Sequence, residues 1–258
     1  MIIIRDIVKS FEEKSVLRGV NLDILDGEKL VIIGQSGCGK SVLLKLILNL
    51  LQPDNGYILV DDIAIKKVGQ TDLFTLRKQF GFLFQGAALF DSMTVAENIR
   101  LPLVEHTKMS PNEMRVKVAE KLDLVGLPGI ENLKPAELSG GMKKRVGLAR
   151  AIIMEPKYIL YDEPTTGLDP IMAANIDKLI IELSEKLNVT SIVVTHDMQS
   201  VTKVADRVVM LHDGIIMFNG SVSELQTTGE PAVRQFVKGS PDGPIQSGPG
   251  LSQSVFRS

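Results

Sequence analysis

The chain is poor in the residues on which several common classes of protein depend. Among its 258 residues there are one cysteine, three histidines and no tryptophan. The single cysteine, Cys38, cannot form an internal disulfide, which fits a reducing compartment. His106 and His212 show no spacing typical of a metal site. The composition therefore excludes a scaffold held together by internal disulfides.

Long apolar runs and an excess of charge are also lacking. The longest apolar run, Val42 to Leu51, is interrupted by Lys45 and Asn49 and is shorter than the roughly 20 residues of a membrane-spanning helix. The N-terminus MIIIRDIVKSF lacks the regions of a signal peptide, which favours the cytosol. The formal net charge of -2 offers no general field for a polyanion. We therefore expect no bilayer crossing and no nucleic-acid partner.

Alternating strands and helices dominate what is present. With 44% hydrophobic residues, the chain can bury a substantial core. Several of the strands predicted below are apolar throughout, which indicates a sheet covered on both faces. The sequence thus predicts an α/β fold. The predicted strands are Ile2 to Val8, Val20 to Leu25, Lys29 to Ile33, Tyr57 to Val60, Phe80 to Phe84, Tyr158 to Tyr161, Thr190 to Thr195 and Arg207 to Leu211.

The pattern becomes helical in the middle third. Residues 109–127 and 140–156 have helical spacing, with Ser110 as a cap before Pro111 and with Pro156 ending the second helix. This predicts a helical subdomain at about 87–155, inserted into a domain that covers 1–239. Residues 240–258 are rich in Pro, Gly and Ser and predict an extended or mobile tail.

The stretch GQSGCGKS, residues 34–41, predicts a phosphate-binding loop. It matches G-x-x-x-x-G-K-[ST] between a predicted strand and a predicted helix. Glycines let backbone N–H groups face a phosphate, Lys40 can reach the outer phosphates, and Ser41 would hold Mg²⁺. The thiol of Cys38 is either reactive, with a pKa depressed by the helix start and Lys40, or inert. The residues assigned to the nucleotide are Gly34, Gln35, Ser36, Gly37, Cys38, Gly39, Lys40, Ser41 and Val42.

Two further stretches fit a nucleotide site. In YILYDEP an apolar strand ends in Asp162 and Glu163, which suit an Mg²⁺ ligand and a general base. In LSGGM, residues Ser139, Gly140 and Gly141 open a long amphipathic helix, where unpaired N–H groups make a second anion site. Each stretch also has an ordinary structural interpretation, as a polar strand end or a helix cap. The two anion sites lie about 100 residues apart, so they serve one nucleotide only if folding or a second copy joins them.

Taken in order, these motifs resemble the ATPase subunit of ABC transporters over roughly residues 1 to 235. GQSGCGKS resembles the Walker A loop, LSGGM the signature and YILYDE the Walker B strand. Gln85 resembles the Q-loop glutamine, Asp169 in GLDP the D-loop aspartate and His196 the switch histidine. Phe11 falls where an aromatic ring stacks on adenine in that family. Met142 is a departure, because the signature usually has glutamine there.

The resemblance implies a P-loop NTPase core with an antiparallel β subdomain and an inserted helical subdomain. It also implies a head-to-tail homodimer that encloses two ATP molecules with Mg²⁺. Ser139 and its glycines would act in trans, Gln85 would sense Mg²⁺ and water, and His196 would contact the γ-phosphate. Glu163, His196 and Gln85 are thus the expected catalytic residues, and Ser41, Gln85 and Asp162 the expected metal ligands.

Finer similarity points to the Mla-type phospholipid transporters. LFQGAALFDSMTVAENI, SGGMKKR and RQFVKGSPDGPI resemble their ATPases. This implies integral membrane permease subunits as partners and a peripheral location at the cytoplasmic face of the inner membrane. It adds a small STAS-domain protein and a periplasmic lipid-binding component as candidate partners, and a tail that reaches the other subunit.

Alternative functions remain open at this stage. An ABC ATPase for another small molecule would share every motif, and so would a non-transport ABC ATPase with a soluble partner. A small-molecule kinase would share the phosphate loop but would need no signature helix. Lys143, Lys144, Arg145 and Arg150 form a basic face, which is interpreted as a solvated helix side.

Overall fold

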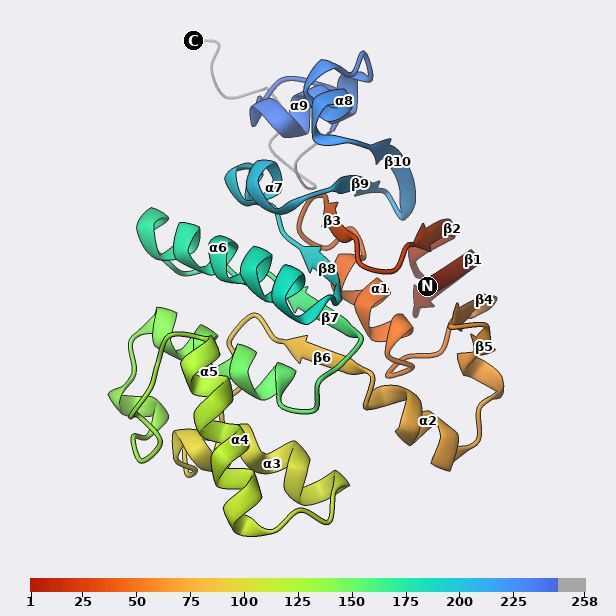
Figure 1. Cartoon of the computed structure of the whole chain (residues 1–258). Coiled ribbons are helices and arrows are strands. Elements are labelled where there is room, and N and C mark those ends of the chain that lie inside the picture. The colour runs from red at the N-terminus through yellow and green to blue at the C-terminus, as the bar shows by residue number, and fades with distance from the viewer. Residues whose placement is uncertain (246–258) are drawn as a thin grey trace.

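The computed structural model describes residues 1–245, with the side chains of all but residues 67, 70 and 71. Two sheets and a group of helices make up this part of the chain (Figure 1). The strands are β1 Ile2–Phe11, β2 Lys14–Ile24, β3 Lys29–Ile33, β4 Asn55–Val60, β5 Ile63–Ala64, β6 Phe80–Leu83, β7 Tyr158–Asp162, β8 Thr190–Val194, β9 Arg207–His212 and β10 Ile215–Gly220. All eight predicted strands are present, and β5 and β10 are additional.

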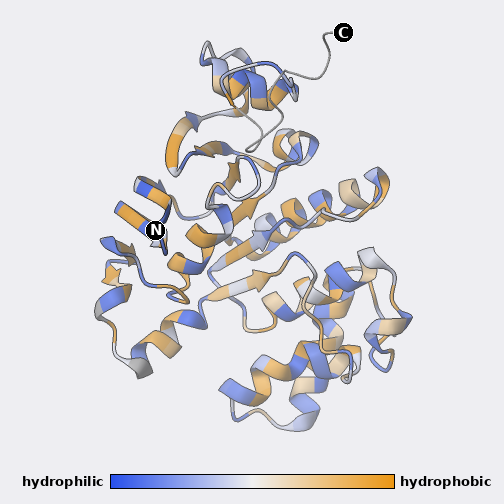
Figure 2. Ribbon diagram, turned by 180° about the vertical axis from the view of Figure 1, so that it is seen from behind, coloured by the Kyte–Doolittle hydropathy of each residue, from blue (hydrophilic) through white to orange (hydrophobic). Residues whose placement is uncertain are grey.

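The larger sheet has the order β10-β9-β3-β8-β7-β6. The strands from β9 to β6 are parallel, and β10 pairs with β9 in the antiparallel sense. Alternate residues of β3 belong to separate cores: Leu30 packs on one face of the sheet and Val31 on the other. Because both faces are covered, β3, β7 and β8 read as continuous apolar runs, as the sequence predicted. Figure 2 shows orange, hydrophobic residues in the strands at the centre of the molecule.

The smaller sheet is antiparallel, with the order β2-β1-β4-β5. With helix α1 it covers one face of the larger sheet, where Ile4, Leu22 and Leu44 share a core with Ile32 and Val194. The mixed α/β architecture with an antiparallel β layer is therefore as predicted. It brings the start of β2 against the loop after β3, since Val16 and Leu17 lie next to Gly39.

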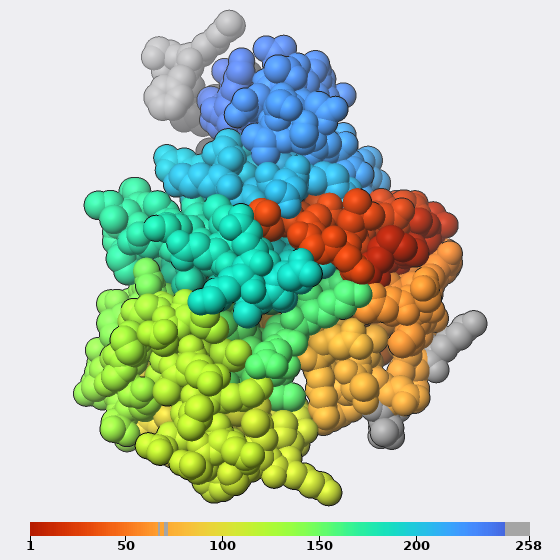
Figure 3. Space-filling view, viewed as in Figure 1, coloured from red at the N-terminus to blue at the C-terminus, as the bar shows by residue number. Residues whose placement is uncertain are grey.

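Helices lie on both faces of the larger sheet and extend beyond it. They are α1 Lys40–Ile47, α2 Gln70–Arg77, α3 Val95–His106, α4 Pro111–Leu124, α5 Gly140–Ile152, α6 Pro170–Leu187, α7 Met198–Val204, α8 Val222–Thr227 and α9 Pro231–Lys238, with short 3₁₀ turns at Ile65–Lys67 and Pro135–Glu137. Helices α3, α4 and α5 pack on one another and reach the sheet through β6. Figure 3 shows them as a yellow-green body beside the orange residues of α2.

Local chemistry explains where the predicted helices begin and end. Ser110 caps α4 in a reciprocal capping box with Glu113, and Pro111 opens the helix, as predicted. Helix α5 ends at Ile152, before the predicted stop at Pro156. The residue before a proline is disfavoured in a helix, and Glu155 has a left-handed φ of 54°. The chain therefore leaves the helix earlier than the proline itself.

The predicted tail from 240 begins as packed chain. Ile245 is buried, and its N–H donates to Oε1 of Gln235 on α9 at 2.7 Å. The amide of Gln235 in turn donates to the carbonyl of Ile245 at 3.0 Å. The rest of the predicted tail, 246–258, lies outside the described residues.

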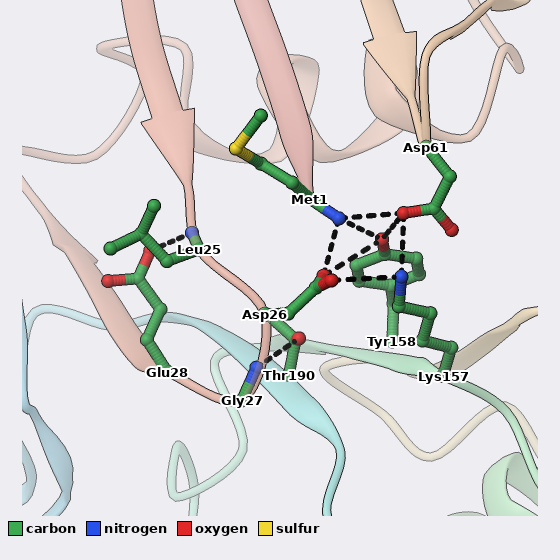
Figure 4. Close-up of polar contacts among 9 residues, drawn as sticks. All are labelled: Met1, Leu25, Asp26, Gly27, Glu28, Asp61, Lys157, Tyr158 and Thr190. Atoms are coloured by element: carbon green, nitrogen blue, oxygen red, sulfur yellow. Dashed lines mark hydrogen bonds and ion pairs between the residues drawn. The ribbon is translucent and has the colours of Figure 1, made fainter.

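A polar cluster joins the N-terminal strand to the base of β7 (Figure 4). Lys157 donates to Asp61 at 2.6 Å and pairs with Asp26 at 3.1 Å. The hydroxyl of Tyr158 donates to Asp61 at 2.7 Å, and the N-terminal ammonium of Met1 contacts Asp61 at the same distance. Burial raises the pKa of Asp61, but the hydrogen bonds outweigh burial and hold it at about 2. The Asp61 carboxylate is therefore a stabilising contact between the two sheets.

Asp61→Asn should lower the free energy of unfolding at pH 7 by about 1–2 kcal/mol. A carboxyl with a folded pKa below its unfolded value adds stability above the unfolded pKa and loses it as pH falls through the folded pKa. The difference between parent and variant should thus be full above about pH 4 and shrink towards about pH 2. Urea unfolding at several pH values measures it. Asp62→Asn is the matched control, because Asp62 is the exposed neighbour and shares the left-handed backbone. An equal loss in both variants would contradict the prediction.

Candidate functional site

The loop 34–41 leaves β3 in a conformation that depends on glycine. Gly34, Gly37 and Gly39 have φ values of 149°, 80° and 107°. A Cβ on Gly34 would lie 2.1 Å from the carbonyl oxygen of Leu211, and a Cβ on Gly39 would lie 2.7 Å from Cδ2 of Leu17. Gly34 and Gly39 are therefore required by both backbone shape and close packing, and Gly37 by backbone shape alone. The sequence interpretation of this loop as a turn between strand and helix is confirmed.

Helix α1 begins directly after this loop with Gly39 as its N-cap, which provides no side-chain hydrogen bond. Its first N–H groups consequently keep their capacity for an anionic ligand. Lys40 is buried, and its ammonium donates to the carbonyls of Gly34 at 2.8 Å and Gln35 at 3.0 Å. A loop of backbone donors with one cation held across it has the chemistry of a phosphate cradle.

Ser41 and Asp162 meet across 121 residues of sequence. The Ser41 hydroxyl in the first turn of α1 donates to Oδ1 of Asp162, at the end of β7, at 2.9 Å. The carboxyl ends of the parallel strands β3 and β7 lie at one edge of the sheet, so the pairing follows from the topology. A hydroxyl and a carboxylate beside a phosphate cradle form the oxygen donor set that Mg²⁺ prefers.

Cys38 does not have the depressed pKa that the sequence left open. Burial raises the pKa of its thiol, and this outweighs the opposing effect of the nearby Lys40 charge. The thiol packs as an apolar group against the core beneath the smaller sheet. Partial burial of the side chain therefore disfavours a reactive thiolate at this position.

Glu163 follows Asp162 at a strained turn. Its φ of 51° is left-handed, which costs a non-glycine residue about 1–2 kcal/mol and is typical of functional sites. Oε2 of Glu163 lies 2.8 Å from Nδ1 of His196 and accepts from the hydroxyl of Thr166 at 3.1 Å. Nδ1 of His196 faces this carboxylate oxygen, which leaves Nε2 on the far side of the ring. The structure thus places two predicted catalytic residues in contact. It also places Thr166 at this site, although no sequence motif indicated Thr166.

Gln85 lies on an exposed loop after β6 that the signature helix holds in place. Lys144 on α5 donates to the carbonyls of Gln85 and Glu163, the latter at 3.2 Å. Arg150 donates to the carbonyls of Ala87 at 2.6 Å and Ala88 at 2.8 Å. The interpretation of this helix side as solvated is wrong for both cations, since Lys144 is only 5% exposed and Arg150 is half-buried.

Arg145 also faces the protein, because its guanidinium donates to the carbonyl of Val125 at 2.9 Å. Lys143 is thus the member of the predicted basic face for which the described residues give no side-chain contact. The error has a physical origin: periodicity reveals which positions face the core, but it does not reveal unpaired carbonyls of a distant loop that a cation can satisfy.

The second predicted anion site lies at the start of α5. Ser139 and Gly140 are exposed, and the Ser139 hydroxyl caps the helix by accepting from the N–H of Met142 at 3.3 Å. Gly141 is buried, and a Cβ there would lie 2.1 Å from the methyl carbon of Met172. Two exposed residues backed by a packed glycine form a flat surface that another molecule can approach closely.

Asp169 is engaged within its own helix. Its Oδ1 accepts from the N–H groups of Ile171 and Met172, each at 3.0 Å, and so caps α6. Leu168, just before it, packs near Gly140 of the signature helix. The structure thus gives Asp169 a capping role, and its assignment to the nucleotide stays a prediction.

Phe11 ends β1 on an exposed hairpin. Its ring is 42% exposed, and the ammonium of Lys9 lies 5.4 Å from the ring centroid. Its pairing partner Lys14 on β2 lines a polar pocket of about 350 Å³ with residues 35–38 of the phosphate loop and with Arg18. The hairpin therefore lies beside the cradle, with its aromatic ring free for a planar ligand.

The predicted site residues fall into two groups within one chain. The cradle, Ser41, Asp162, Glu163 and His196 converge at the carboxyl edge of the larger sheet. The signature residues lie at the start of α5, which packs with α3 and α4, whereas α1 packs against β7 (Figure 1). In the described part of this chain, no hydrogen bond or ion pair connects Ser139 with the cradle.

Comparisons with known proteins agree on one family. Residues 17–166 match the model of the family described as ABC transporter. The chain is 43% identical to the probable ribonucleotide transport ATP-binding protein mkl of Mycobacterium leprae, over 94% of this chain and 70% of that protein. It is 42% identical to the intermembrane phospholipid transport system ATP-binding protein MlaF of Escherichia coli, over 93% of this chain and 90% of that protein.

A solved structure confirms the predicted fold class. It is the dimeric, post-hydrolysis state of an ATP-binding cassette bound to ADP and Pi. The similarity has a TM-score of 0.79 at 34% identity and covers 86% of this chain and 99% of that one.

Proposed function

Because this chain belongs to the ABC transporter family, as an ATP-binding subunit that hydrolyses ATP, we propose that it powers phospholipid transport through a separate membrane permease. The observation that carries the proposal is the 42% identity that extends over 90% of MlaF. The stretches that resemble Mla-type ATPases support the same cargo. The relative named for ribonucleotide transport makes a nucleotide the second candidate cargo.

We propose that the cradle binds the phosphates of ATP and that the exposed ring of Phe11 stacks on adenine. Phosphate oxygens would compete with the carbonyls of Gly34 and Gln35 for the ammonium of Lys40. Ser41 and Asp162 fit Mg²⁺, because their hydroxyl and carboxylate oxygens are already within hydrogen-bond distance. Bound there, the ion would neutralise charge on the outer phosphates.

Glu163 is proposed as the general base that takes a proton from the attacking water. The contact with His196 and the hydrogen bond from Thr166 both involve Oε2, and together they hold the carboxylate in one orientation. His196 then presents Nε2 to the γ-phosphate, and Gln85 brings its amide to the water from the loop after β6. These roles follow from position and from donor and acceptor chemistry.

We propose that a second copy completes each pocket. Ser139 and the cradle sit on different elements with no hydrogen bond or ion pair between them in the described chain, so we propose that the signature residues of another subunit meet the same ATP. Donors supplied by another subunit can stabilise the charge on the transferring phosphoryl group. Such donors can raise the rate of hydrolysis by ~10³-fold or more. The dimeric state of the similar cassette supports this arrangement.

The proposed permease contact is a groove between α2, α3 and α5. It has a volume of about 240 Å³, and its wall combines Phe74 and Phe82 with Lys78, His106 and Arg150. Among residues 1–245, no helix has both the length and the apolar character needed to cross a bilayer. The similarity to MlaF supports the proposal that the subunit is peripheral at the cytoplasmic face of the inner membrane. A STAS-domain protein and a periplasmic lipid-binding component remain proposed partners.

Reconstitution tests the cargo. The chain, co-purified with its native membrane partners, should move a headgroup-labelled phospholipid between membranes in an ATP-dependent way in proteoliposomes. The same vesicles loaded with a labelled ribonucleotide should show no ATP-dependent flux. The Glu163→Gln variant controls for passive exchange in both arms. Ribonucleotide flux without phospholipid movement would replace the proposed cargo and leave the ATPase assignment intact.

A further inference from the structure

Helix α5 holds the Gln85 loop through three residues on one face. Lys144, Gly147 and Arg150 are spaced three apart, so these positions follow one another along one side of the helix. A Cβ on Gly147 would lie 3.1 Å from Cβ of Ala87, which shows how closely the helix backbone approaches the loop. Arg150 binds two carbonyls of this loop, and Lys144 binds a third.

The loop that they hold is strained. Ala87 and Ala88 have left-handed φ values of 61° and 47°, a conformation that residues with a side chain rarely adopt. Such a loop persists only where its surroundings fix it. The charge-assisted bonds from Lys144 and Arg150 provide that restraint, because hydrogen bonds from a cation are stronger than neutral ones.

Lys144 differs from Arg150 because it also binds a carbonyl outside the Gln85 loop. Its ammonium also donates to the carbonyl of Glu163, so one buried side chain connects the end of β7 with the loop after β6. Burial lowers the pKa of Lys144, while the charges of Glu163 and Asp162 oppose that effect. An ammonium in this position is retained at a cost in desolvation, which indicates a role beyond solubility.

We propose that Lys144 is a positioning residue for ATP hydrolysis, which keeps the backbone at Gln85 and Glu163 in register with helix α5. The inference rests on the proposed roles of those two residues. Helix α5 begins at Ser139, which serves the ATP held by the other subunit. Lys144 therefore makes Glu163 of one pocket and the signature of the other move as one body. Loss of this tie displaces the catalytic groups while the cradle that binds ATP stays intact.

Steady-state kinetics on the full chain tests this inference. In Lys144→Met, kcat should fall about 30-fold, because small displacements of catalytic groups cost one to two orders of magnitude. KM for ATP should stay within about threefold of the parent, because the ATP-binding cradle is untouched. Lys144→Arg, which keeps charge and donors, should recover at least about a third of the parental kcat. Lys143→Met, the next position on the same helix, should stay within about twofold.

Circular dichroism melting separates positioning from folding. If Lys144→Met does not fold, Lys144→Gln replaces it, since glutamine keeps a donor without the charge. A folded Lys144→Met or Lys144→Gln variant that retains more than half of the parental kcat overturns the inference, and so does a loss that Lys143→Met shares equally. Glu163→Gln in the same assay distinguishes a failure of this inference from a failure of the proposed function. If Glu163→Gln also remains fully active, the proposed role of Glu163 fails, and not only the positioning role of Lys144.

Discussion

Glu163→Gln should reduce the rate of ATP hydrolysis by about a thousandfold and leave ATP binding nearly unchanged. Glutamine keeps the size of the side chain and can still contact His196 and Thr166, but its amide cannot take a proton from water. The cradle and the Ser41–Asp162 pair are unaltered, so the nucleotide is still held. With hydrolysis blocked, ATP should accumulate between two subunits and trap a dimer.

Two measurements check this result. Phosphate release at saturating ATP gives the rate, and size-exclusion chromatography with light scattering gives the mass with and without ATP. Glu185→Gln on the exposed side of α6 is the matched control and should behave like the parent. Full activity of Glu163→Gln, or a variant that stays monomeric with ATP bound, would remove Glu163 from its role.

Lys40→Ala should weaken ATP binding by about a hundredfold or more and make hydrolysis undetectable at millimolar ATP. Lys40 is buried and supplies the one side-chain cation that the described structure places across the cradle. Its loss removes the charge-assisted hydrogen bonds that the cradle offers to the outer phosphates. Lys45→Ala, on the exposed side of the same helix, is the control and should keep parental affinity in a fluorescent-nucleotide titration.

A mixture of two inactive variants extends this prediction. In a heterodimer of Lys40→Ala and Ser139→Ala, one pocket carries both lesions and the other carries neither. Random pairing should therefore restore up to about a quarter of the parental activity if subunits exchange freely. A mixture that remains inactive although heterodimers form would contradict pockets shared between subunits. Parental activity of either single variant would contradict it too.

The sequence predicted most of the fold because its strands are buried and apolar. β3, β7 and β8 are covered on both faces and read as uninterrupted runs of apolar residues. β5 has only two residues, too few for any pattern. β10 does have a sequence signal: Asp213 and Gly214 before it form the D-G dipeptide that is typical of a tight hairpin, here with β9.

The candidate site was predictable where its chemistry is local in sequence. Each motif of the site is a short stretch of consecutive residues, so it is visible in the sequence. The parallel sheet then places Ser41 next to Asp162. The contacts of Lys144 could not be predicted from the sequence, because the carbonyls that it binds belong to residues 59 and 19 positions away. The direction of the Cys38 pKa depends on burial, and a motif does not report burial.

The position of β3 has a consequence for how the chain is made. The phosphate loop follows β3 near the N-terminus, yet β3 pairs with β8 and β9, and Gly34 packs against Leu211. During synthesis this loop leaves the ribosome early but lacks its neighbours until more than 150 further residues have emerged. A nascent chain halted before β9 should therefore fail to retain nucleotide and should depend on chaperones to shield its unpaired central strand.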